Sequence, residues 1–326
     1  MSRTAALLAS LRVANAPSVV CNVTIGYLLG RYYWGDMQAV GPVVVPLVLA
    51  GLALYFAGNL ANDWFDRDWD KTHRPERALP SGLISADTYL TSAVVLGMAG
   101  IGLGFSQGPR SGFTAIAVLV CIAIYTRIHK ATVWGVLPMG LCRAGLYVMG
   151  FVAAWPSEAV DTIDLHAYGV TQADVVADTV RSIAFVATHA LGLLIYISGL
   201  SLSARCESLE HPPVGTLILS RSMLFLPLAA MSAWWIPWYP LLGVAGMVSF
   251  AIWLGLSLTV FRKPIPRFVS ALLAGIPLTD FIAAVPLGAT FSVPGESLSL
   301  AGGLAFILPP LAFLSALLLQ RFTPAT

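Results

Sequence analysis

The sequence predicts an all-α polytopic membrane protein, a helical bundle of about nine or ten transmembrane helices. Two observations predict it. The chain is 57% hydrophobic and only 10% charged, with a mean hydropathy of +0.80, which lies outside the usual range of soluble domains. Its apolar runs are also long, and a bilayer core needs about 20 apolar residues per helix. We expect a single membrane domain over residues 1–326.

The apolar runs define the expected helices in order. The amino terminus has no short apolar core followed by a small-residue cleavage site, so its first long run is expected to be a span and not a cleaved signal. One run, at 112–126, is short, and another is broken by Pro277, Asp280 and Pro286. The runs lie near 13–30, 40–61, 87–105, 112–126, 133–154, 183–204, 216–236, 240–261, 268–288 and 299–320.

The basic residues predict the orientation. If the amino terminus is cytoplasmic and ten spans alternate, fourteen Lys and Arg residues fall on the cytoplasmic side and three outside. Cytoplasmic loops carry the excess of basic residues in most membrane proteins. We therefore expect an integral membrane protein, of a bacterial inner membrane, whose polar chemistry lies on the cytoplasmic face.

A charged stretch, NDWFDRDWDKTHRPERALPSG at 62–82, follows the second apolar run. Asn62, Asp66 and Asp70 are spaced four residues apart, so on a helix they share one face. Three oxygen-bearing side chains on one face favour a hard cation, and Mg²⁺ commonly uses one or two carboxylates together with substrate phosphate oxygens. Asp63 and Asp68 are expected to point elsewhere, into solvent.

Basic residues follow these acids. Lys71, Arg74 and Arg77 fit a phosphorylated ligand, because guanidinium groups bind phosphate oxygens in pairs. Taken alone, they also fit a solvated loop that orients the protein in the membrane.

A second acidic pair, Glu207 and Glu210, lies beyond the sixth apolar run. The two residues are neighbours on a helix surface and could hold a second metal ion. They could equally form a solvated helix end, and Arg205 could neutralise them.

Polar residues inside predicted spans are costly and usually face a cavity or a partner. Arg143 and Asp280 could pair with each other, or Arg143 could contact a substrate. His189 is a candidate general base or a hydrogen-bonded interior histidine. Asn59 also fits a cavity, and Tyr196 could line it or belong to an interfacial aromatic belt.

Two motifs resemble the UbiA superfamily of intramembrane prenyltransferases. The first is N-x-x-x-D-x-x-x-D at Asn62, Asp66 and Asp70, and the second is the R-P-x-R-x-L-P-x-G continuation at 74–82. The segment LRVANAP before the first span is similar to the opening of these proteins, and MGLCRAGLYVMG and IPLTD resemble the EboC-like branch. The superfamily's second, Asp-rich motif is replaced here by LSLSARCESLEH, where Glu207 and Glu210 would stand in for aspartates.

The resemblance implies a bundle with a central cavity open to the cytoplasm, and Mg²⁺ as the cofactor. It assigns catalysis to Asn62, Asp66 and Asp70, which would hold metal together with Glu207 and Glu210. The implied substrate contacts are Arg12, Lys71, Arg74, Arg127, Lys130, Arg143 and Tyr196.

The function expected is Mg²⁺-dependent transfer of a prenyl group from an isoprenyl diphosphate to a small, unidentified acceptor within the lipid bilayer. A terpene cyclase of the same superfamily is an alternative, since the same ionisation can lead to ring closure. A transporter is a weaker alternative, because no internal repeat is evident. No nucleic-acid partner is expected, and the sequence leaves the prenyl chain length and the oligomeric state open.

Overall fold

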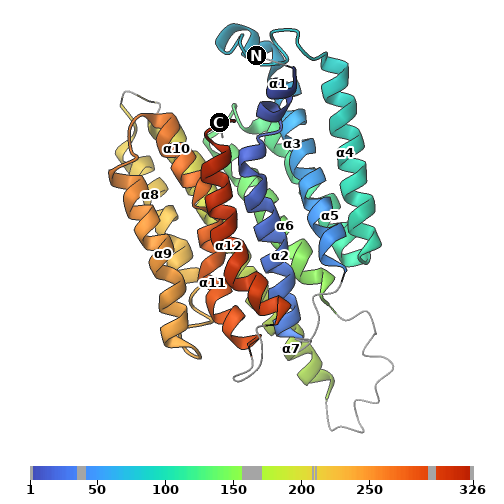
Figure 1. The fold of residues 1–326 in the computed structure, drawn as a ribbon, viewed down its shortest axis with the longest axis vertical. Coiled ribbons are helices and arrows are strands. Elements are labelled where there is room, and N and C mark those ends of the chain that lie inside the picture. The colour runs from blue at the N-terminus through green and yellow to red at the C-terminus, as the bar shows by residue number, and fades with distance from the viewer. Residues whose placement is uncertain are drawn as a thin grey trace.

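The computed structural model describes residues 3–34, 42–155, 171–207, 209, 211–292 and 299–323. Within these residues every regular element is helical, and the long helices run alongside one another in a bundle (Figure 1). Short 3₁₀ turns at Val13–Asn15 and Val133–Gly135 lead into α2 and α6. The helices are α1 (Arg3–Ser10), α2 (Ala16–Tyr33), α3 (Val44–His73), α4 (Ala86–Ser106), α5 (Pro109–Ile128), α6 (Val136–Ala153), α7 (Gln172–Glu207), α8 (Val214–Ala230), α9 (Pro240–Thr259), α10 (Ile265–Ala274), α11 (Ile276–Thr290) and α12 (Leu300–Leu319).

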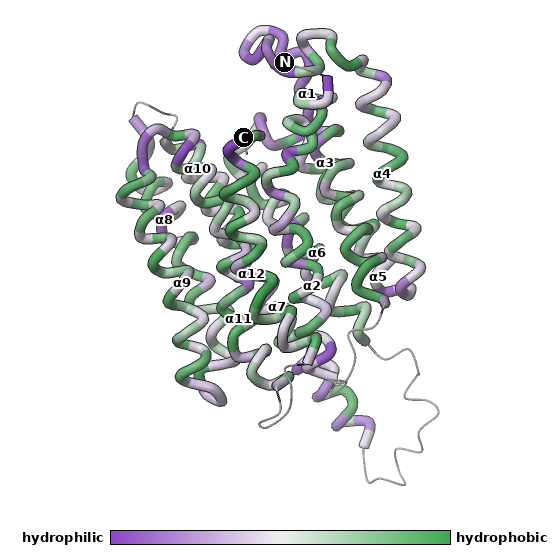
Figure 2. Tube along the Cα trace, viewed as in Figure 1, coloured by the Kyte–Doolittle hydropathy of each residue, from purple (hydrophilic) through white to green (hydrophobic). Residues whose placement is uncertain are grey.

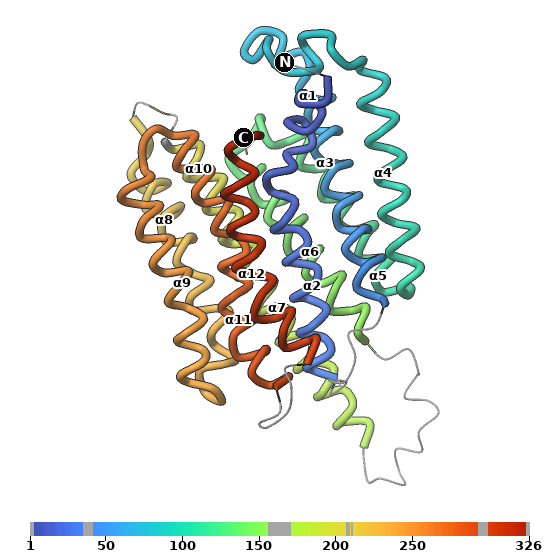
Figure 3. Tube along the Cα trace, viewed as in Figure 1, coloured from blue at the N-terminus to red at the C-terminus, as the bar shows by residue number. Residues whose placement is uncertain are grey.

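The prediction of about nine or ten membrane spans is confirmed. Nine segments of the described chain are long and apolar enough to cross a bilayer, with α10 and α11 together forming one of them. The expected span at 216–236 is the shorter helix α8, of 17 residues. Helix α1 and the end of α12 lie at the same end of the bundle (Figures 1 and 3). For both elements to lie there, the described chain must run along the bundle an even number of times. Helix α8 is therefore the tenth helical segment to do so, after the nine long ones.

The predicted span at 268–288, which prolines interrupt, shows where a helix ends and where it tolerates proline. The break falls at Gly275, between α10 and α11, and Pro277 lies in the first turn of α11. Proline is tolerated there because the first amide groups of a helix have no intrahelical partner. Asp280 and Pro286, which also interrupt the apolar run, both lie inside α11.

Burial separates central from peripheral helices. In α2 and in the α10–α11 segment, 78% of the apolar stretch is buried inside the protein, against 28% in α4, α9 and α12. The peripheral helices expose large apolar side chains such as Val95, Ile252 and Leu314. A helix that is apolar on its outer face fits lipid and not water.

Helices α2 and α6 pack through glycines. A Cβ atom at Gly26 would lie 2.2 Å from the carbonyl oxygen of Tyr147, and one at Gly150 would lie 2.2 Å from that of Val23. Small residues let helix backbones approach closely in membranes, where van der Waals contact replaces the hydrophobic effect as the source of helix association.

Hydrophilic residues gather at the end of the bundle where α3 connects to α4 (Figure 2). Helix α3 has 30 residues and is therefore about 45 Å long at 1.5 Å per residue. This exceeds the roughly 30 Å of bilayer hydrocarbon, so the last turns of α3 extend beyond it. The predicted helical continuation through Asn62, Asp66 and Asp70 is confirmed.

Candidate active site

An internal cavity of about 380 Å³ lies between α3, α5, α6, α7 and the α10–α11 break. Most of its wall is apolar. Its polar end, which we call the mouth, is formed by Arg12, Asn62, His129 and Arg205. The remaining wall residues include Leu54, Tyr55, Gly58, Asn59, Val118, Ile122, Tyr125, Val136, Met139, Cys142, Arg143, Leu146, Ile197, Leu200, Ser201, Ala204, Val269, Leu273 and Ile276. The predicted central cavity is therefore present.

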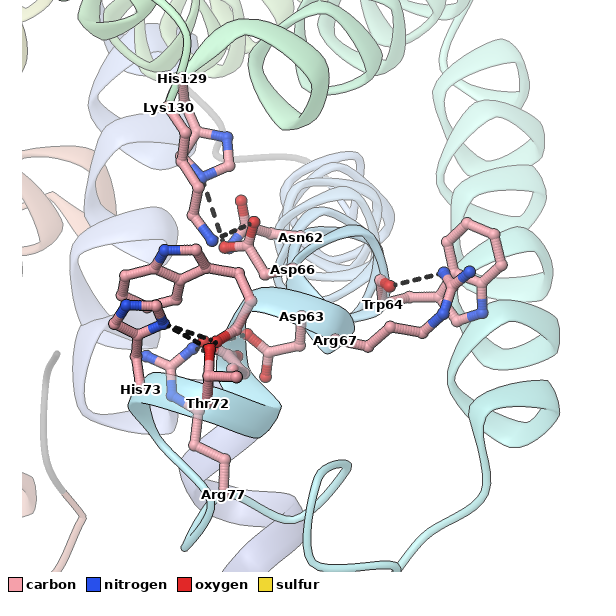
Figure 4. A network of polar contacts seen from close by, with 12 residues as sticks. Asn62, Asp63, Trp64, Asp66, Arg67, Thr72, His73, Arg77, His129 and Lys130 are labelled. Atoms are coloured by element: carbon pink, nitrogen blue, oxygen red, sulfur yellow. Dashed lines mark hydrogen bonds and ion pairs between the residues drawn. The ribbon is translucent and has the colours of Figure 1, made fainter.

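Asp66 lies at the mouth, where it is contacted by two nitrogen-bearing side chains from the turn after α5. Lys130 Nζ lies 2.7 Å from Asp66 Oδ1, and His129 Nε2 lies 3.3 Å from Asp66 Oδ2. Figure 4 shows both side chains reaching from their turn toward Asn62 and Asp66 on α3. Asn62 Nδ2 donates to Asp66 Oδ2 at 3.4 Å. Lys130 was predicted to contact substrate, whereas His129 was missed.

Asp70 and Asp63 are bound by arginines. Arg77 Nη1 lies 2.9 Å from Asp70 Oδ2 and 3.8 Å from Asp63 Oδ1. Arg12 Nη2 lies 2.9 Å from Asp63 Oδ1. The prediction that Asp63 points into solvent is wrong: it is buried between two arginines. The chain folds back after α3 through a turn at Gly82, whose φ of 73° suits a residue without Cβ.

Arg12 occupies an unusual backbone conformation at the mouth. Its φ is 49°, the left-handed region that is rare for residues with a side chain. Tyr55 Oη donates to the carbonyl of Arg12 at 3.0 Å, and Asn59 Nδ2 donates to that of Leu11 at 2.9 Å. Burial, the largest single influence, would lower the pKa of the Arg12 guanidinium, but the Asp63 carboxylate together with Tyr55 and Tyr125 outweighs it, and the pKa is raised. Arg12 is therefore a fixed cation.

The oxygen atoms on the α3 face suit a hard cation. Asn62 Oδ1 and Asp70 Oδ1 are buried and have no hydrogen-bond partner within the described residues. Buried polar atoms without partners are uncommon, and oxygen is the ligand that Mg²⁺ prefers. Among the described residues no group of three or more His, Cys, Asp or Glu side chains could hold a metal ion. The face therefore suits an ion that takes its other oxygens from water and substrate.

Several predicted substrate contacts lie away from the cavity wall. Lys71, Arg74 and Arg127 are exposed, and Lys71 pairs with the exposed Asp68 at 2.9 Å. Tyr196 is buried, and its hydroxyl donates to the carbonyl of Leu272 at 2.7 Å. These side chains do not line the cavity, because helix rotation and chain reversal point them elsewhere.

The predicted second metal pair cannot be placed. Helix α7 ends at Glu207, but the Glu207 side chain and the whole of Glu210 lie outside the described residues. Arg205 does line the cavity. It was noted only as a neighbour of the acidic pair and was missed as a site residue; its spacing of four from Ser201 on α7 is the signal that could have revealed it.

A second polar group lies deeper in the bundle. Arg143 Nη1 donates to Asn22 Oδ1 at 3.2 Å, and Asn22 Nδ2 donates to Asp280 Oδ2 at 2.8 Å. Asn22 therefore bridges Arg143 and Asp280, for which a direct pair was one of the two alternatives. Arg143 lines the cavity, and its guanidinium carbon lies 5.2 Å from the ring centre of Tyr55.

His189 is a packing residue and not a base for this cavity. Its Nδ1 hydrogen-bonds the carbonyl of Phe185 at 2.8 Å, and its Nε2 accepts from Trp235 Nε1 at 3.0 Å. With both ring nitrogens bonded and the ring fully buried, the alternative of a hydrogen-bonded interior histidine is confirmed.

The fold and the cavity define a class: an integral membrane protein that encloses an apolar chamber with an ionic mouth. The UbiA prenyltransferase family model matches residues 19–276, and the chain belongs to this family. The predicted superfamily is confirmed, and the EboC-like branch stays a prediction. Family membership favours the prenyltransferase prediction over the transporter alternative.

Curated relatives match over part of their length. Chlorophyll synthase, chloroplastic, of Oryza sativa subsp. japonica is 35% identical over 89 residues, which are 27% of this chain and 23% of that protein. Digeranylgeranylglyceryl phosphate synthase of Methanothermobacter thermautotrophicus is 28% identical over 165 residues, 50% of this chain and 56% of the relative. The chain thus spans between about a quarter and just over half of the length of these relatives.

Solved structures share the fold. A structure described with digeranylgeranylglyceryl phosphate synthase has a TM-score of 0.58 at 18% identity and covers 88% of this chain and 99% of its own. A UbiA homologue from Archaeoglobus fulgidus, bound to DMAPP and Mg²⁺, has a TM-score of 0.50 at 12% identity and covers 97% and 99%.

Proposed function

We propose that this protein transfers a prenyl group from an isoprenyl diphosphate to a small acceptor inside the membrane, with residues 1–326 acting as one domain. One observation supports this above the others: an apolar cavity ends in a mouth where buried carboxylates meet several cations. A prenyl diphosphate has the same division, an apolar chain and a highly charged headgroup. Membership of the UbiA prenyltransferase family supports the same activity.

Asn62, Asp66 and Asp70 would hold Mg²⁺ at the mouth. Their oxygen donors fit this ion, and a homologue of the same fold is described with DMAPP and Mg²⁺. When bound, Mg²⁺ would supply positive charge that stabilises the departing diphosphate. Arg12, His129 and Lys130 surround the same position and would hold the headgroup oxygens by charge-assisted hydrogen bonds.

The cavity wall would protect the reactive end of the prenyl group. Loss of diphosphate leaves an allylic cation, which water would capture. Leucine and isoleucine side chains at Leu54, Ile122 and Leu146 leave few polar atoms in the wall to hold water. The Tyr55 ring lines the same cavity and can stabilise positive charge through its π face.

Arg143 would contact the acceptor. Arg143 is only 8% exposed. It lines the cavity, and a hydrogen bond to Asn22 holds it in place. A guanidinium has five N–H donors, and a donor in an apolar cavity gains most from a partner that arrives with the ligand. This favours an acceptor that places an oxygen atom at Arg143.

The mouth would open to the cytoplasm. Basic residues Arg12, Arg77, Lys130 and Arg205 belong to this end of the bundle, and an excess of basic residues marks the cytoplasmic side. A bacterial inner membrane stays a prediction.

The test is Mg²⁺-dependent release of diphosphate from geranyl diphosphate, with the full chain in detergent micelles. Asp66→Ala should abolish release, while Asp68→Ala, on the same helix but exposed, should retain it. Mass spectrometry of lipids gained on expression, compared with the Asp66→Ala strain, would then identify the prenylated product. Normal turnover by Asp66→Ala would refute the assignment, and a cyclised hydrocarbon formed without acceptor would replace transfer by the cyclase alternative.

A further inference from the structure

The mouth of the cavity has two unlike walls. On the α3 wall Asn62 lines the cavity, and the carboxylates Asp66 and Asp70 follow it on the same face of the helix. The α7 wall presents one helical stripe to the cavity, with spacings of three, one, three and one residues. This stripe consists of Ile197, Leu200, Ser201, Ala204 and Arg205. Toward the mouth, α7 therefore offers a hydroxyl and a guanidinium where α3 offers acids.

Arg205 is fixed close to the acidic wall. Its Nη1 donates to the carbonyl of Thr132 at 2.9 Å, and its Nη2 donates to the carbonyl of His129. The side chain of the same His129 lies 3.3 Å from Asp66. One turn of the chain thus contacts both Arg205 and Asp66, through the carbonyl and the ring of His129.

On the α7 wall, no carboxylate among the described residues is available to bind a second divalent cation. Among the α7 residues that line the cavity the charged one is Arg205, and the side chain of Glu207, the acid two residues further on, lies outside the described residues. The guanidinium would also repel a metal ion at this place. The same group binds phosphate oxygens in pairs, which makes it a substitute for the metal as a contact to the diphosphate.

We propose that the headgroup site holds a single Mg²⁺, on the α3 wall, and that Arg205 provides the opposite positive contact to the diphosphate from α7. This proposal rests on the proposed function and gives it one particular form. It differs from a site with two metal ions in which Glu207 and Glu210 hold the second.

The first experiment counts metal ions on the unsubstituted chain. Mn²⁺ replaces Mg²⁺, and geranyl S-thiolodiphosphate, which resists ionisation, serves as the probe. Equilibrium dialysis should give one Mn²⁺ per chain at saturating probe, and the electron paramagnetic resonance spectrum should show the six-line pattern of an isolated ion. Two Mn²⁺ per chain with spin-coupled lines would overturn the proposal and assign the second ion to Glu207 and Glu210.

The second experiment removes the guanidinium. Arg205→Gln should weaken probe binding roughly ten- to hundredfold, the usual loss for a hydrogen bond to a charged group, with the count still at one Mn²⁺. Arg205→Lys should recover part of the affinity. Arg267→Gln, an exposed arginine at the start of α10, is the matched control and should bind as the unsubstituted chain does.

The other possible results of the two experiments also decide the proposal. Unchanged probe affinity in Arg205→Gln would overturn the proposal. If this variant fails to fold, the Mn²⁺ count of the unsubstituted chain and the affinity of Arg205→Lys decide. If the unsubstituted chain binds neither Mn²⁺ nor the probe, the proposed function itself fails, and the inference with it.

Discussion

Asp63→Asn tests the ionic network at the mouth, because Asp63 joins two cations that come from different parts of the chain. Arg12 lies before α2 and Arg77 follows α3, and the carboxylate is 2.9 Å and 3.8 Å from their guanidinium groups. Asparagine keeps the shape of the side chain and removes its charge. The variant should lose stability and also weaken the binding of the diphosphate, since Arg12 would no longer be held in position.

The two distances set the magnitude. With an effective dielectric constant of about 20, a unit charge pair contributes about 6 kcal/mol at 2.9 Å and about 4 kcal/mol at 3.8 Å. The arginine side chains are 20% and 24% exposed, so water recovers part of this, and asparagine keeps a neutral hydrogen bond. We expect a net loss of about 2–3 kcal/mol in unfolding free energy, the usual cost for hydrogen bonds to charged groups.

The assay is the unfolding free energy in mixed micelles, measured by titration with dodecyl sulfate. Asp68→Asn is the matched control: it makes the same change five residues along the same helix, at a side chain that is 71% exposed and paired with exposed Lys71. Exposed ion pairs contribute about 0–1 kcal/mol, so the control should change little. Equal losses in the two variants, or a loss below about 0.5 kcal/mol in Asp63→Asn, would refute the assigned role of Asp63.

Three further outcomes are expected. Gly26→Ala should destabilise the bundle by about 1–3 kcal/mol or more, because its Cβ would lie 2.2 Å from the carbonyl oxygen of Tyr147. Gly102→Ala is the control and should leave stability unchanged, because nothing lies within 4 Å of its added Cβ. Unfolding in mixed micelles measures both. Trp235→Phe should lower the unfolding free energy by about 1–3 kcal/mol by leaving the buried acceptor of His189 without a donor, while diphosphate release from the folded variant stays unchanged. Chelation with EDTA should stop diphosphate release, and added Mg²⁺ should restore it; release that persists in EDTA would contradict the metal assignment.

Local patterns in the sequence predicted much of this molecule. Apolar runs long enough to cross a bilayer predicted the helices, and the spacing of Asn62, Asp66 and Asp70 predicted their shared helical face. The boundaries were less predictable. Pro277 lies in the first turn of α11 and Pro286 in its interior, and the break between α10 and α11 falls before both of them, at Gly275.

The sequence by itself determined a polytopic helical protein with an oxygen-rich face on the end of its second long helix, because composition and helical periodicity act over a few residues at a time. Only the tertiary structure decided which side chains gather with those acids at the mouth. His129 and Arg205 come to the mouth from segments about 60 and 140 residues beyond α3's acids, and Asp63 is buried between two arginines and not solvated. The packing of the helices brings these residues together, and no local spacing in the sequence predicts which residues meet.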